Sequence, residues 1–205
     1  MSRWRQFRLA GWLAAAAALA LPAAGYGQQA DKPSKPKHAA KQKPAAPAED
    51  AQAALGGAQP NLLGQYAEWG AYTALAAGSK VCFALARPQE SKTSPAGKPR
   101  DPTYMFVASR PAENVRNEVS VTIGYAFKAG ADATIEIGSA KFALYTQSDG
   151  AWIKNAAEEG RMVDAMRKGS DLVVTGTSAR GTRSTDRYTL KGLSQALDRA
   201  AQECK

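Results

Sequence analysis

One stretch of strict alternation constrains the fold of this chain more than any other feature. Between residues 119 and 127, every odd position is apolar and every even position is small or polar. Because successive side chains of a β-strand point to opposite faces, this period of two predicts a strand with one buried face. Half-buried strands of this kind are typical of antiparallel sheets. The buried positions are expected to be Val119, Val121, Ile123, Tyr125 and Phe127.

Other short strand patterns, separated by turn residues, follow one another through residues 61–205. The loop over 87–101, which contains three prolines, interrupts them. The predicted fold class is therefore mainly β (α+β): an antiparallel β-sandwich or partly open barrel of about eight strands with two helices. The remaining strands are expected over 65–73, 80–86, 104–109, 134–137, 141–146, 151–153, 171–177 and 184–190.

Two segments carry helical signals instead. Asn155 is a good N-cap, Glu158 stands at the capping-box position, and Gly169 follows the apolar stripe of Met162, Val163 and Met166. A second helix is predicted over 193–204, with its apolar residues at i, i+4, i+7 and i+11. This C-terminal helix is expected to pack on the sheet.

The N-terminal region predicts export. Three arginines within the first eight residues precede an apolar run over 12–21, and the small residues Ala23, Ala24, Gly25 and Gly27 follow. Because this run is too short for a membrane-spanning helix, residues 1–27 are interpreted as a signal peptide, cleaved between Ala24 and Ala30. A retained membrane anchor is the alternative. The mature chain is then expected to be periplasmic or secreted, with no membrane span.

A segment rich in Pro, Ala and Lys occupies residues 28–60. It has almost no apolar residue larger than Ala, Leu55 being the exception, so it is predicted to be a disordered linker. Its five lysines have two possible roles: they attract the segment weakly to an anionic surface, or they only keep it solvated and prevent its collapse. The chain carries +9 overall, but the segments before residue 61 hold more than half of it and residues 61–205 only +4. This weak charge argues against a nucleic-acid partner.

The chain has two cysteines, Cys82 and Cys204. Cys82 lies on a strand face whose other residues, Ala84 and Ala86, are small, and Cys204 ends the apolar stripe of the last helix. Since export places the chain in an oxidising compartment, these positions predict a Cys82–Cys204 disulfide between helix and strand. Two free buried thiols are the alternative.

Residues 61–205 contain no histidine and no C-x-x-C pair, which excludes a His-dependent nucleophile and the usual zinc sites. No cofactor, metal site or catalytic residue is predicted. Acid pairs such as Asp132 with Glu136 would serve acid–base chemistry only if the fold brought them together. A candidate binding surface is formed by Arg180, Arg183 and Arg187, whose guanidinium groups suit carboxylates, phosphates or glycans. The alternative is a solvated hairpin tip offset by Asp186.

The domain resembles the invasion-associated locus B family of exported bacterial proteins, over nearly all of residues 61–205. The early and near-terminal cysteines are the most specific part of this resemblance. The segments that carry it are 66–72, 80–82, 110–111, 118–120, 124–127, 149–153 and 192–197, with Cys204. The resemblance implies a secreted or periplasmic protein without an established enzymatic activity.

The expected function is that of an exported, non-enzymatic envelope protein of this type. It would bind an envelope or host protein or polymer, or support the cell envelope or host interaction. The alternative is a carboxylate-dependent hydrolase or transferase of envelope polymer.

Overall fold

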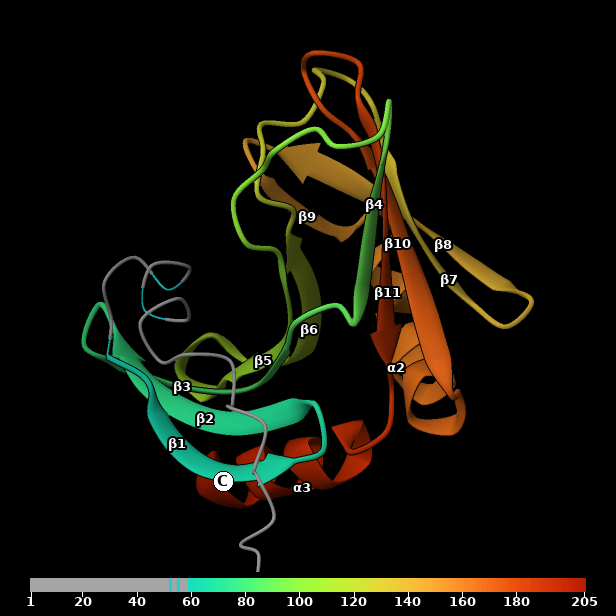
Figure 1. The fold of residues 1–205 in the computed structure, drawn as a ribbon. Helices are drawn as coiled ribbons and strands as arrows, with labels where there is room; N and C mark the ends of the chain where they lie inside the picture. Colours follow the sequence, from blue (N-terminus) through green and yellow to red (C-terminus); the bar gives the residue numbers. More distant parts are fainter. Residues whose placement is uncertain (1–51, 53–54, 56–58) are drawn as a thin grey trace, which may run out of the picture. The chain divides into compact units, whose positions relative to one another are not determined.

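The computed structural model describes residues 52, 55 and 59–205. The predicted signal peptide over 1–27 and the predicted linker as far as residue 51 lie outside the described residues. In the described part, eleven strands form one continuous sheet in the order β1-β2-β3-β5-β6-β9-β8-β7-β10-β11-β4 (Figure 1). The strands are β1 (Asn61–Tyr66), β2 (Trp69–Ala76), β3 (Ser79–Ala86), β4 (Glu90–Ser94), β5 (Tyr104–Arg110), β6 (Val115–Thr122), β7 (Ala133–Ile137), β8 (Ala140–Gln147), β9 (Gly150–Ile153), β10 (Asp171–Thr177) and β11 (Arg183–Thr189).

Every neighbouring pair in this sheet is antiparallel, and β1 and β4 are its two edges. The mainly β, partly open architecture with two helices is therefore confirmed. The strand count is higher than the predicted eight or so, for two reasons. The segment 65–73 is not one strand, since Ala67 takes a positive φ of 50° and turns the chain from β1 into β2. The loop over 87–101 also contains a strand, β4, whose polar residues pair with β11.

The strand predicted over 119–127 ends earlier, at Thr122, and begins earlier, at Val115. Its inward positions Val119, Val121 and Ile123 are buried as expected. Beyond them, Gly124 takes a φ of +77°, which stops the extended conformation. Only an isolated bridge between Phe127 and Ser178 continues the pairing.

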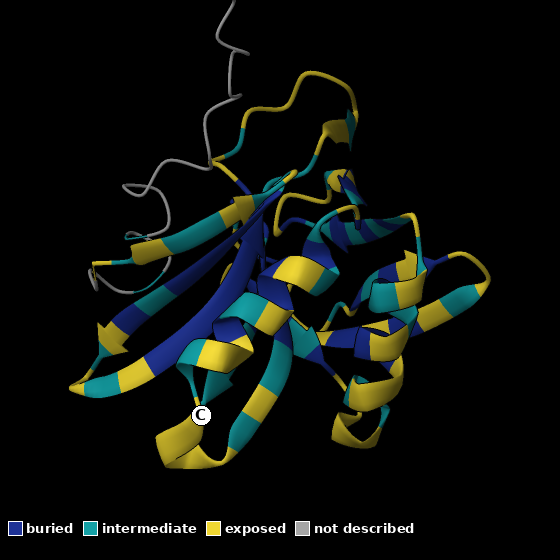
Figure 2. Cartoon of the chain, turned by 90° about the horizontal axis from the view of Figure 1, so that it is seen from below, coloured by how far each residue is buried: buried dark blue, intermediate teal, exposed yellow. Residues whose placement is uncertain are grey.

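The helices are α2 (Glu159–Lys168) and α3 (Leu193–Glu203), and a 3₁₀ turn over 156–158 leads into α2. Asn155 caps this turn by accepting a hydrogen bond from the Ala157 amide. The predicted capping box is wrong in one respect, because the Glu158 carboxylate binds Arg161 instead. The predicted apolar stripe of α2 is buried, and α3 packs on β1, β2 and β3. Both helices keep an exposed outer face (Figure 2).

Apolar side chains form two clusters. The larger one fills the space between the sheet and the two helices, around fully buried Trp69, Phe142 and Tyr188. The smaller one lies on β2, β3 and β5 and includes Tyr72 stacked on Phe83, with ring centroids 5.3 Å apart. Leu55, inside the predicted linker, packs against this smaller cluster. None of the helices in the described part is long and apolar enough to cross a membrane.

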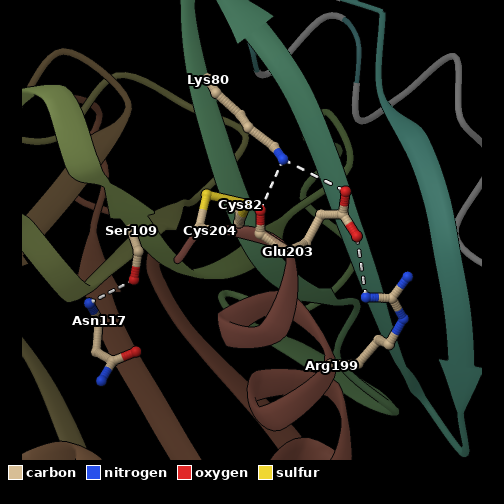
Figure 3. Close-up of a disulfide and its surroundings, with 7 residues drawn as sticks. All are labelled: Lys80, Cys82, Ser109, Asn117, Arg199, Glu203 and Cys204. Carbon is tan, nitrogen blue, oxygen red and sulfur yellow. Dashed lines mark hydrogen bonds and ion pairs between the residues drawn. A yellow bond between two sulfur atoms is a disulfide. The ribbon is translucent and has the colours of Figure 1, made fainter.

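The structure joins Cys82 of β3 to Cys204 at the end of α3 by a disulfide, as predicted (Figure 3). The two Cα atoms lie 5.9 Å apart, although 122 residues separate them in sequence. Ala84 and Ala86, beside Cys82 on β3, are completely buried, in keeping with close approach of the helix. Next to the disulfide, the Lys80 ammonium donates to the Glu203 carbonyl at 2.6 Å and so satisfies one of the last carbonyls of α3. The C-terminal helix is thus tied to β3 by both a covalent and a polar link.

Candidate functional site

A pocket of about 490 Å³ opens where three connections of the sheet meet. They are the end of β4 with the loop after it, the segment that follows β6, and the β10–β11 loop, which gather at the top of Figure 1. This volume is typical of small-molecule sites. The lining residues are Thr93, Lys98, Pro99, Arg100, Asp101, Gly124, Tyr125, Ala126, Ser178, Ala179, Arg180 and Thr182.

A buried ion pair joins the lining residue Arg100 to Asp186, which does not itself line the pocket; we call this pair the base of the pocket. The Arg100 guanidinium binds both carboxylate oxygens of Asp186, with Nη1 at 2.8 Å from Oδ2 and Nη2 on Oδ1. Nη1 also donates to the Ile123 carbonyl at 3.2 Å. Burial alone would favour a neutral Arg100, but the hydrogen bond and charge of Asp186 outweigh it and hold the pKa of Arg100 above its ordinary value. The side chains of Arg100 and Asp186 are 9% and 0% exposed, so water does not compete for this pair.

Neutral hydroxyl groups surround the ion pair. The Tyr125 hydroxyl lies 2.6 Å from Ser184 Oγ, and Thr103 donates to the Thr122 carbonyl at 2.7 Å. Burial is the main cause that raises the pKa of both Tyr125 and Tyr188 above the ordinary phenol value. These phenols therefore stay protonated at physiological pH, and the base of the pocket carries no net charge.

Gly124 sets the position of one pocket wall. At its φ of +77°, a Cβ atom would lie 2.1 Å from the carbonyl oxygen of Asp101. The Asp101 amide in turn donates to the Gly124 carbonyl at 3.0 Å. Only glycine allows these two strand-end segments to approach so closely, and this approach places Arg100 next to β11.

The rim of the pocket carries two exposed cations, Lys98 and Arg180. Among the described residues, neither side chain has an ion-pair or hydrogen-bond partner. Two hydroxyl oxygens of the lining already accept backbone hydrogen bonds: Thr93 Oγ1 from the Lys98 amide at 3.2 Å, and Ser178 Oγ from the Thr182 amide at 3.1 Å. Their own O–H protons remain available as donors. The rim therefore offers mainly positive charge and hydrogen-bond donors.

The structure separates the three arginines of the predicted binding surface. Arg180 lines the pocket, whereas Arg187 binds Asp171 of the neighbouring strand. Arg183 is exposed at the start of β11, four residues and so roughly 13 Å from Arg187. The expectation that Asp186 offsets these arginines is wrong, because Asp186 occupies an inward position of β11 and is bound by Arg100.

Sequence reasoning missed Lys98 and Arg100 as residues of this site. One signal was available in β11. Asp186 lies two residues from both Ser184 and Tyr188, so it shares the inward face of the strand with them. A buried carboxylate requires a cation or several donors, so an acid at such a position predicts a partner elsewhere in the fold. The sequence does not reveal which cation fills that role.

The other acids considered from the sequence are engaged separately. Asp132 binds Lys154, and Glu136 of β7 binds Lys141 of β8. Across the described residues, no group of three or more His, Cys, Asp or Glu side chains is arranged to hold a metal ion. Trp69 is a core residue whose indole donates to the Thr189 carbonyl at 2.8 Å, and Trp152 stacks on Tyr145.

Comparison with models of known protein families gives a match for this chain. Neither the curated proteins nor the solved structures contain a match to the chain. The family described as invasion associated locus B (IalB) protein matches residues 69–201, which run from the buried Trp69 of β2 almost to the end of α3. This match covers well over half of the chain and includes the pocket and Cys82. The chain therefore belongs to the invasion associated locus B (IalB) family.

Proposed function

We propose that this IalB-family chain is an exported, non-enzymatic protein of the cell envelope that acts by binding a partner in the envelope or on a host cell. The observation that carries the proposal is the composition of the pocket. Its rim presents two cations, hydroxyl donors and one acid, Asp101, and its lining residue Arg100 is bound to both oxygens of the buried Asp186 carboxylate. Such a site is equipped to hold a ligand.

The Cys82–Cys204 disulfide supports the exported half of the proposal. Stable disulfides form in oxidising compartments and are rare in the cytosol. This bond agrees with the signal-peptide pattern of residues 1–27, and the basic segment that follows would act as a spacer between the folded domain and its surroundings.

The alternative, hydrolysis or transfer on envelope polymer, requires acids that exchange protons with a substrate. Asp101 is the one carboxylate among the pocket-lining residues, whereas glycoside hydrolysis usually takes a pair of acids with separate roles. The composition of the pocket therefore favours binding over this chemistry.

Affinity capture tests the proposal. The mature full-length chain, immobilised and incubated with envelope extract, is expected to retain a polymer or protein whose mass stays unchanged over hours. A chain denatured by reduction in urea is the control and should retain nothing specific. Shortening of the captured polymer would favour the enzymatic alternative, and capture of nothing beyond the control would contradict binding.

A further inference from the structure

We propose that the pocket beside the β10–β11 loop binds an anionic, acceptor-rich group, a carboxylate or phosphate ester carried on a sugar-sized unit. This inference rests on the proposed binding function and names the ligand class of the same site. It follows from three properties of the pocket: the free charges at its rim, the direction of its hydroxyl hydrogen bonds, and its volume.

The charges select an anion. Arg100 and Asp186 neutralise each other at the base, so they contribute little net field. Of the remaining charged lining residues, Lys98 and Arg180 are cations and Asp101 is an acid, which leaves an excess of one positive charge. The two cations come from different loops, one after β4 and one between β10 and β11, so they can reach a ligand from two sides.

The hydroxyl groups select hydrogen-bond acceptors. Thr93 and Ser178 use their oxygens to accept from backbone amides, which leaves each O–H proton to be donated. A ligand rich in acceptor oxygens satisfies these donors, whereas an ammonium group would meet two cations and no free carboxylate except that of Asp101. Hydrogen bonds that involve an ionised group are the stronger ones, which favours carboxylate or phosphate over a neutral sugar hydroxyl.

The volume and the apolar lining set the size of the ligand. A cavity of about 490 Å³ exceeds what an isolated carboxylate or phosphate ion would fill. Pro99, Tyr125 and Ala179 contribute apolar surface that suits the ring face of a sugar. An acidic sugar or a polyol phosphate fits both properties, and both classes occur in polymers at cell surfaces.

Titrations of the mature full-length chain, followed by amide chemical shifts, test this inference. The probes are D-glucuronate, glycerol 1-phosphate and, as the neutral counterpart, D-glucose. Saturable shifts at Thr93, Ser178 and Thr182 are expected with at least one of the anions, and binding of glucose should be at least tenfold weaker. The anion that binds with the higher affinity shows whether the pocket prefers a carboxylate or a phosphate ester.

A pair of variants separates the pocket from general charge. K98A/R180A removes both free rim cations and is expected to weaken anion binding at least tenfold without changing the fold, since both side chains are exposed. R116A/K168A removes two exposed cations that do not line the pocket and should bind like wild type. Three results would overturn the inference. Glucose could bind as tightly as the anions, no probe could give saturable shifts, or the two double variants could lose the same amount of anion affinity. If another surface of the chain binds the partner, the wild-type chain would still capture envelope material although the pocket binds no anion. Failure of this inference is therefore distinguishable from failure of the proposed function.

Discussion

Arg100, in the loop between β4 and β5, holds both oxygens of the Asp186 carboxylate on β11, and the two residues lie 86 positions apart in the sequence. This contact connects two strands that are far apart in the sheet. Arg100 lies in the loop that leads into β5, the fourth strand in the sheet order, and Asp186 lies on β11, the strand next to the β4 edge. The contact also forms the base of the pocket. The ion pair therefore positions the proposed binding site and contributes to the fold at the same place.

Removal of one partner of this pair is expected to be costly. R100M would leave Asp186 buried without a cation, so the free energy of unfolding should fall by about 3–5 kcal/mol. The double variant R100M/D186L removes both charges and should recover most of that loss. Urea denaturation of the two variants and of the control K98M checks this. A double variant no more stable than R100M would contradict the assignment.

Gly124 offers a second test of the pocket geometry. G124A places a Cβ atom on the Asp101 carbonyl, whereas G181A has the same sign of φ but nothing within 4 Å of its Cβ. The G181A substitution is therefore expected to cost about 1–2 kcal/mol from backbone strain alone. G124A should cost clearly more and should shift the amide resonances of residues 100 and 101. Equal effects of the two substitutions would show that the close approach at Gly124 does not constrain the wall.

The disulfide is expected to supply a large share of the stability of the domain. It closes a loop of 122 residues, for which the loop-entropy model gives about 5 kcal/mol. C82A/C204A should lose that amount in urea denaturation, measured against the oxidised wild type. The control K80M breaks the exposed contact with Glu203 at the same junction and should leave the stability close to that of the wild type. A loss below about 1 kcal/mol for the double cysteine variant would contradict the role of the bond.

Glu159 predicts a pH dependence. Burial, as the main cause, raises the pKa of its carboxyl above the ordinary value of 4.5, against the opposing hydrogen bond from the Val119 amide. The folded state therefore binds more protons than the unfolded state just above pH 4.5, and this group's contribution to stability falls as the pH rises through that window.

E159Q keeps an oxygen that can accept from Val119 and removes the charge. Its free energy of unfolding relative to wild type is therefore expected to increase from about pH 4 to about pH 7. Thermal denaturation at several pH values measures this difference, with D164N, an exposed acid on the same helix, as the control for the change in charge. A difference that shrinks as the pH rises would contradict the raised pKa of Glu159.

The sequence predicted the elements whose signals are local. The β7–β8 hairpin, β10 and the two helices appear close to their expected positions, because alternation, turn residues and apolar stripes are encoded within each segment. β4 escaped prediction because its residues Glu90–Ser94 are all polar and the strand is specified by pairing with β11, about 90 residues later. Edge strands of this kind have no buried face to impose a period.

The candidate site illustrates the same limit. Arg180 was recognisable as a binding residue from its loop, but Lys98 and Arg100 join it only through the three-dimensional meeting of three connections. The disulfide could be predicted because few alternatives exist for two cysteines in an exported chain. The ion-pair partner of a given acid cannot be predicted in this way, because the chain contains many arginines and acids that could pair.

The state of the native chain in its own cell tests the proposed export most directly. After fractionation, the chain should be found in the envelope fraction or the medium, beginning between Ala24 and Ala30, and alkylation before reduction should leave its intact mass unchanged. A chain recovered from the cytosol with Met1 present and with both Cys82 and Cys204 alkylated would contradict export and the disulfide together.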